Sequence, residues 1–150
     1  MACSCMSADL VIGGYVRIAK QDLDGARLLN RAANRNAAYL CEQAAEKLIR
    51  AVLTSEGIQA GVRHELPDMV AKIADENPVK PLLRAIEHLD AYATAYRYPS
   101  PRGRVKTAPT PADIDQDIAK IDDALVEIAA RFAIDLSKLD GPAGKPDPIR

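Results

Sequence analysis

The sequence predicts an all-α fold, an up-and-down bundle of four long helices with one short helix inserted. Apolar residues recur every three or four positions through most of the chain, which is the period of helices that bury one face. No segment alternates apolar and polar residues as a half-buried strand does. The loops between the predicted helices are short, and short loops favour antiparallel neighbouring helices.

The length and composition indicate one globular domain. A chain of 150 residues buries enough surface to fold without disulfides or metals. The net charge of −1 excludes binding of nucleic acid by the charge of the whole protein, so any anion site must be local. We expect an N-terminal segment over 1–14, a helical bundle over 15–135 and a disordered tail rich in proline and glycine over 136–150.

The sequence carries no signal for a membrane or for secretion. Its longest apolar runs fall far short of the roughly 20 residues that span a bilayer. The first residues lack the basic stretch and the long apolar stretch of a secretory signal. Three cysteines form no disulfide framework, and Cys41 lies on an apolar helical face. These features predict a cytoplasmic protein with reduced thiols and no membrane partner.

The first two helices are expected over about 15–32 and about 35–56. The second has the clearest pattern, because its apolar positions cover about half of the helical circumference. Such a helix is contacted on two sides, as the central helix of a bundle is. Glu46 and Arg50 have the favourable order of an i,i+4 ion pair, and Gly57 is a plausible C-cap. The apolar positions of the second helix are Ala37, Leu40, Cys41, Ala44, Ala45, Leu48, Ile49 and Val52.

A short third helix is expected over about 64–75. A fourth helix is expected to begin between Pro78 and Pro81 and to end near Tyr98, because two prolines follow and disfavour helical backbone before them. Its expected inner positions are Leu82, Ile86, Leu89, Ala93 and Tyr96.

The fifth helix has the best-defined start in the sequence. Thr110 provides an N-cap, Pro111 occupies the first helical position and Asp113 is an acidic residue at the third. The apolar residues that follow alternate spacings of four and three, which predicts a narrow seam against one groove of the bundle. They are Ile114, Ile118, Ile121, Leu125, Ile128 and Phe132.

The stretch 91–106 concentrates aromatic and basic residues. Three of the five tyrosines lie here, and no carboxylate occurs between Asp90 and Asp113. Arginine and lysine side chains donate to phosphate, and an exposed tyrosine stacks on a base. The stretch therefore predicts an anion or nucleotide site whose candidate ligand-binding residues are Arg97, Tyr98, Arg102, Arg104 and His64, with Lys106 beside them.

Two structural alternatives compete with that site. Arg97 is expected at the C-terminus of the fourth helix, where a cation favours the negative end of the helix dipole. The aspartates of the fifth helix could also neutralise the basic residues, within the fold or across a dimer. They are Asp113, Asp115, Asp117, Asp122 and Asp123.

The two histidines give no metal-binding pattern. His64 and His88 are far apart, and neither has a second histidine four residues away. Cys3 and Cys5 form an isolated pair at the N-terminus. The sequence has no glycine-rich phosphate loop, nucleophile elbow or cluster of cysteine and histidine. We therefore expect neither a metal site nor a cofactor.

Four segments resemble the HEPN domain family, named for higher-eukaryote and prokaryote nucleotide binding. They read AKQDLDGARLL, AAYLCEQAAEKLIRAVLTSEG, HELPDMV and AYRYP, in the family's order, within about 15–135. The most specific part is Gln43-x-x-Glu46-Lys47-x-x-Arg50-Ala51. The resemblance implies an all-α bundle that commonly forms a homodimer and binds a nucleotide or RNA. It also implies pairing with a small nucleotidyltransferase, often as a toxin with its antitoxin.

Many members of that family are metal-independent endoribonucleases that use Arg-x4–6-His. This sequence departs from the motif, because three residues separate Arg84 from His88, Arg63 adjoins His64, and no histidine follows Arg97. If the chain were a nuclease, His64 and Arg97 would have to meet in space, with histidine moving a proton and arginine stabilising the phosphorane.

Three functions stay open from the sequence. The favoured one is a non-catalytic, homodimeric module that binds a nucleotide or the phosphates of RNA. The first alternative is an endoribonuclease toxin, and the second is a structural partner protein without a ligand.

Overall fold

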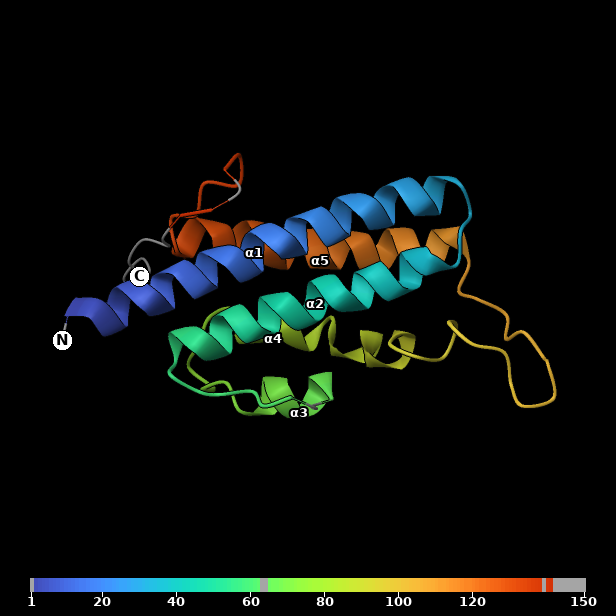
Figure 1. Ribbon diagram of the computed structural model, residues 1–150, viewed down its shortest axis with the longest axis horizontal. Helices are drawn as coiled ribbons and strands as arrows, with labels where there is room; N and C mark the ends of the chain where they lie inside the picture. The colour runs from blue at the N-terminus through green and yellow to red at the C-terminus, as the bar shows by residue number, and fades with distance from the viewer. Residues whose placement is uncertain (1, 63–64, 139, 142–150) are drawn as a thin grey trace.

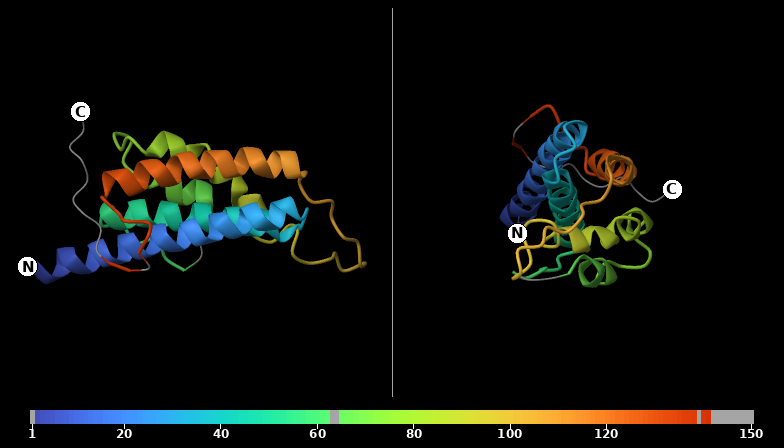
Figure 2. Two further views of the ribbon diagram at one scale, coloured as in Figure 1. Left: turned by 90° about the horizontal axis from the view of Figure 1, so that it is seen from above. Right: turned by 90° about the vertical axis from the view of Figure 1, so that its right-hand side faces the viewer.

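The computed structural model describes residues 2–62, 65–138 and 140–141 and confirms the all-α class, with no strand among these residues. Three long helices lie side by side, and the shorter elements pack along α2 on the side away from α1 (Figures 1 and 2). α2 contacts every other element, as expected for a central helix. The elements are α1 (Ala2–Arg31), α2 (Asn36–Ser55), α3 (Leu66–Ala71), α4 (Lys80–Arg84), the 3₁₀ helix η1 (Glu87–Tyr92) and α5 (Pro111–Arg131).

The first helix begins much earlier than the sequence predicts. α1 starts at Ala2 and passes through Gly13 and Gly14, so the predicted N-terminal segment 1–14 is helical from residue 2 onward. Each glycine costs a helix about 1 kcal/mol relative to alanine. Ile12 and Val16 are buried on either side of the glycine pair, and this burial offsets the cost.

The prediction of a fourth long helix is wrong. The chain forms only the five residues of α4 and then the 3₁₀ turn of η1, so the described part of the chain has three long helices. Leu83, Ile86 and Leu89 are fully buried and recur every three residues. A 3₁₀ helix has three residues per turn and keeps such a row on one face, whereas an α-helix would rotate the row away from α2.

The start of the fifth helix is confirmed in detail. The Thr110 side chain accepts from the backbone N–H of Asp113 at 3.2 Å, and the Asp113 carboxylate accepts from the backbone N–H of Thr110 at 3.3 Å. This reciprocal capping satisfies two N–H groups that a helix start leaves unpaired. The third helix is shorter than expected, and a carboxyl oxygen of Asp90 caps its first N–H, that of Leu66, at 2.9 Å.

The segment after α5 returns along α1. Arg17, only 6% exposed, donates to the carbonyl oxygen of Asp135 at 3.1 Å and to that of Gly141 at 2.7 Å. Most of the tail predicted over 136–150 lies outside the described residues. Over the residues that the structure covers, no helix is both long enough and apolar enough to cross a membrane.

Candidate functional site

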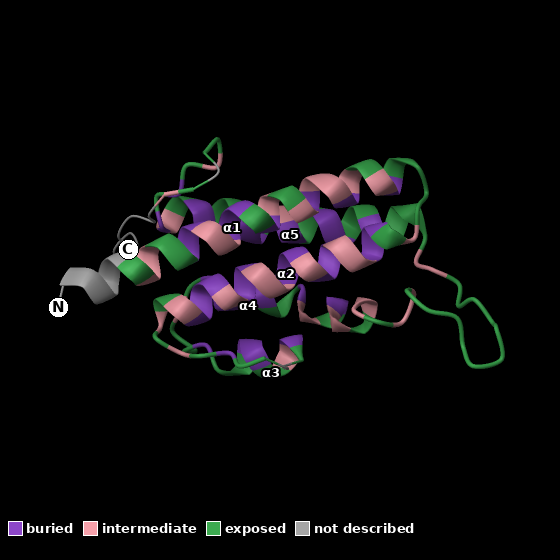
Figure 3. Cartoon of the chain, in the orientation of Figure 1, coloured by how far each residue is buried: buried purple, intermediate pink, exposed green. Residues whose placement is uncertain are grey.

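The segment after η1 is a loop that extends past the end of the bundle (Figure 1). All residues from 97 to 107 are exposed, as the green colour of this loop shows in Figure 3. Its tip is ordered by a turn in which Ser100 bonds to the backbone of Gly103 and Arg104. Gly103 has a φ of +79°, a conformation that glycine adopts without strain. The turn therefore holds Arg102 and Arg104 on a defined backbone.

A surface cavity of about 490 Å³, here called the loop cavity, lies against this loop. Arg104 and Lys106 supply its charge, and none of its described lining residues is a carboxylate. Tyr98 and Val105 are 66% and 67% exposed and offer apolar surface beside the two cations. An Arg35 Nη2 atom donates to the carbonyl oxygen of Lys106 at 2.7 Å and fastens the loop to the start of α2. The lining residues are Ala95, Tyr98, Pro99, Ser100, Arg104, Val105, Lys106 and Thr107.

The aspartates of α5 do not neutralise this loop within the chain. Asp115 accepts from Asn30 at 2.7 Å, and Asp122 accepts from Arg27 at 3.0 Å. Asp113 caps its own helix, and Asp117 binds two residues of η1. Among the described residues, no carboxylate lies within ion-pair distance of the basic side chains at 97, 102, 104 and 106. The positive charge of the loop is therefore open to an outside anion.

Arg97 does not cap a helix, because the residues around it form turns. Its guanidinium carbon lies 4.2 Å from the centroid of the Tyr39 ring and 5.3 Å from that of Tyr98. These are cation–π contacts, and the first joins the loop to α2. No pattern in the sequence indicated that Arg97 would contact Tyr39.

The structure divides the predicted ligand-binding set. Tyr98 and Arg104 share the loop cavity, whereas Arg97 lines a second cavity on the α2 side of the turn. Arg102 lines neither of these two cavities. His64 lies outside the described residues, so its predicted role stays a prediction.

The second cavity, of about 750 Å³, is here called the carboxylate cavity. Four of its residues come from one face of α2 at spacings of three, four and seven, a helical pattern that the sequence already contained. Glu42, Gln43 and Glu46 lie opposite the apolar positions of α2, yet residues of η1 and of the turn after it line the same cavity as these three. The lining residues are Tyr39, Glu42, Gln43, Glu46, Val62, Glu65, Asp90, Ala93, Thr94 and Arg97.

The polar motif of the second helix forms a connected network. Lys47 pairs with Asp22 of α1 at 2.5 Å. Arg50 pairs with Glu46 at 2.8 Å, as its spacing predicts. Lys47 also donates to Gln43 at 3.3 Å. The motif therefore fixes α2 against α1 and aligns the side chains that face the carboxylate cavity.

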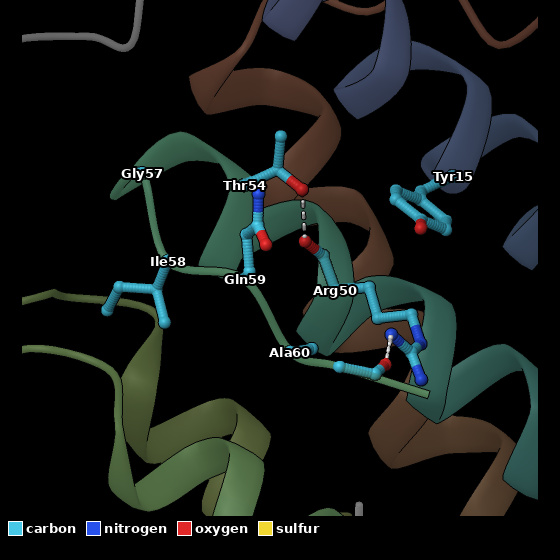
Figure 4. A pocket seen from close by; sticks show the side chains of 8 residues that line it. Tyr15, Arg50, Thr54, Gly57, Ile58, Gln59 and Ala60 are labelled. Carbon is cyan, nitrogen blue, oxygen red and sulfur yellow. Dashed lines mark hydrogen bonds between the residues drawn. The ribbon is translucent and has the colours of Figure 1, made fainter. Parts of the chain in front are cut away.

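A third cavity, of about 440 Å³, lies between Tyr15 of α1 and the residues that follow α2 (Figure 4). Arg50 reaches into it and donates to the carbonyl oxygen of Gly61 at 3.1 Å. Because Glu46 already balances the charge of Arg50, this cavity is a poorer anion site than the loop cavity.

His88 contacts α5, although 48% of its side chain is exposed. Its Nε2 lies 2.9 Å from a carboxyl oxygen of Asp117, and the other oxygen accepts from the Tyr92 hydroxyl at 3.0 Å. Asp117 is 5% exposed, and burial together with this carboxylate raises the pKa of Tyr92. Arg84 pairs with Glu87 at 3.1 Å. This geometry joins η1 to α5 and does not pair His88 with an arginine.

The HEPN domain model matches residues 13–129, which is most of the chain and includes both the loop cavity and the carboxylate cavity. No curated protein and no solved structure is significantly similar to the chain.

Proposed function

We propose that this chain, which belongs to the HEPN domain family, is a homodimeric module that binds a nucleotide or the phosphates of RNA. The observation that carries the proposal is the loop cavity, where Arg104 and Lys106 lie beside an exposed tyrosine and no described lining residue is a carboxylate. An anion entering this cavity displaces no internal ion pair of the described residues.

The chemistry of the loop cavity suits a phosphate joined to a base. Arginine offers a forked pair of donors and lysine a point charge, and both favour phosphate oxygens. Tyr98 exposes a ring on which a base can stack, a contact worth about 1–3 kcal/mol in single-strand binders. The turn at Ser100 fixes the backbone at Arg104 before a ligand arrives, which reduces the entropy lost on binding.

The test is a titration of ATP, GTP and a short single-stranded RNA against the wild type and an Arg104→Ala/Lys106→Ala variant. We expect the double substitution to weaken binding by at least about tenfold. The affinity should also depend less on salt concentration, because the variant makes fewer phosphate contacts and its binding therefore releases fewer counterions. Tyr98→Ala should weaken the binding of RNA and nucleotides but not that of inorganic phosphate. Fluorescence anisotropy measures the binding of RNA, and calorimetry measures the binding of the nucleotides and of inorganic phosphate.

A Lys120→Ala/Arg131→Ala variant is the matched control, since both residues lie on α5 and it removes the same formal charge. Equal weakening by the control, or no binding by the wild type, would contradict the proposal. Cleavage of the RNA by metal-free protein would instead favour the endoribonuclease alternative.

The homodimer is expected to use one face of α1. Leu10, Val11, Ile18 and Leu28 are 44–64% exposed and lie within a 100° sector of this helix. Gly14 lies within the same sector, and a Cβ there would meet nothing within 4 Å, so another helix can approach closely. We expect Ile18→Glu to convert a dimer to a monomer in light scattering, whereas Val126→Glu on α5 should not. A wild-type monomer at high concentration would refute the dimer.

The proposal also includes a protein partner: the chain pairs with a nucleotidyltransferase in a system that resembles a toxin and its antitoxin. Co-purification with the product of an adjacent nucleotidyltransferase gene tests this part, and its failure leaves the anion site unaffected.

A further inference from the structure

Arg97 contacts two aromatic rings that belong to different segments. Its guanidinium carbon lies 4.2 Å from the ring centroid of Tyr39 on α2 and 5.3 Å from that of Tyr98 in the loop. Both distances fall within the roughly 6 Å at which a cation is attracted to the face of a ring. The guanidinium therefore links Tyr98, which lines the loop cavity, to a long helix of the bundle.

Tyr98 is the tyrosine of the stretch 91–106 that is most open to a ligand. Tyr92 and Tyr96 pack against the core and meet edge to face, with their ring centroids 5.6 Å apart. Tyr98 is 66% exposed, even though the Arg97 guanidinium lies over its ring. A ring has two faces and the guanidinium covers one of them, so a base can stack on the other.

The position of Arg97 suits contact with these rings better than contact with a phosphate in the loop cavity. Arg97 lines the carboxylate cavity and is not among the described residues that line the loop cavity. Four acidic residues line the carboxylate cavity, and negative charge there opposes the approach of a phosphate to the guanidinium.

We propose that Arg97 is a positioning residue for the base of the ligand and that Tyr39 anchors it. This inference rests on the proposed function, because it concerns the nucleotide bound at the loop cavity. Tyr39 holds the guanidinium from α2, the guanidinium restrains the Tyr98 ring, and the restrained ring offers a surface for stacking. A ring that is already held in place loses less side-chain entropy when a base arrives.

This arrangement favours ligands that carry an unpaired base. A base stacks on a tyrosine only where its own face is free, as in a nucleotide or a single strand. In duplex RNA the neighbouring bases cover these faces, and inorganic triphosphate has no base. Both ligands can reach Arg104 and Lys106 through their phosphates, but neither gains from the contact between Tyr39 and Arg97.

The test is titration of full-length wild type, Tyr39→Leu and Tyr39→Phe with ATP, a short single-stranded RNA and inorganic triphosphate. Leucine keeps apolar bulk but has no ring. We therefore expect Tyr39→Leu to weaken the binding of ATP and of the RNA by about threefold, the effect of losing one exposed cation–π contact. Phenylalanine keeps the ring, so Tyr39→Phe should bind both as the wild type does. Neither substitution should change the affinity for triphosphate or for duplex RNA.

A second pair of proteins tests whether the effect of Tyr39 passes through Arg97. In an Arg97→Met background, Tyr39→Leu should cause no further loss of ATP affinity, because the guanidinium that joins the two rings is absent. A further loss would show that Tyr39 acts by another route and would overturn the proposal. Tyr15→Leu is the matched control, since it makes the same change on α1 and should leave the affinity for ATP unchanged.

The outcomes separate this inference from the proposed function. Equal affinities of wild type and Tyr39→Leu for ATP and RNA would overturn this inference alone. Equal weakening of ATP and triphosphate binding would do the same, because the effect would then not concern the base. A wild type that binds neither ATP nor single-stranded RNA would refute the proposed function as well.

Discussion

Leu48→Ala should lower the free energy of unfolding by about 3 kcal/mol, within the range of about 2–5 kcal/mol for buried leucines. Leu48 is fully buried on α2, the helix that contacts all the other elements. The substitution removes apolar contacts and leaves a cavity that the long helices around it can close only in part. Urea denaturation followed by circular dichroism measures the change.

Val126→Ala is the control for this experiment. Val126 is 58% exposed on α5, so its truncation should change the free energy of unfolding by less than about 0.5 kcal/mol. A Leu48→Ala protein as stable as Val126→Ala would show that α2 is not the centre of the core.

Asp117→Ala should lower the free energy of unfolding by about 2–3 kcal/mol. The substitution leaves the Tyr92 hydroxyl and the His88 ring without the acceptor that now joins η1 to α5. A polar group left unpaired at a half-buried or buried site costs about 1–3 kcal/mol. Because η1 leads into the basic loop, hydrogen exchange should also become faster in the segment 93–98.

A double-mutant cycle with Tyr92→Phe separates the bond from general effects of the substitution. We expect a coupling of about 1 kcal/mol between Asp117 and Tyr92, since the two side chains share one hydrogen bond. Asp123→Ala, on the exposed face of the same helix, should be nearly neutral. If Asp117→Ala lowered the free energy of unfolding no more than Asp123→Ala does, the conclusion that Asp117 anchors η1 to α5 would be contradicted.

The candidate site was only partly predictable. The exposed basic loop with Tyr98 and Arg104 followed from the absence of carboxylates near them in the sequence, and the structure places both residues at one cavity. Arg97 was expected at a helix end, yet it lies on Tyr39, a residue that is 58 positions earlier in the chain by the sequence numbering. A helical wheel gives the direction of a side chain but not the segment that it meets.

The sequence alone determined the all-α class, the central position of α2 and the start of α5. These features depend on interactions within a few residues, namely periodic burial along one helix and a cap formed by neighbours. Only the tertiary structure decided the 3₁₀ turn of η1, the burial of Glu42 and the joining of Asp117 to His88 and Tyr92. These features depend on which segments pack together, because packing against α2 and α5 outweighs the local preference of the backbone and of single polar side chains.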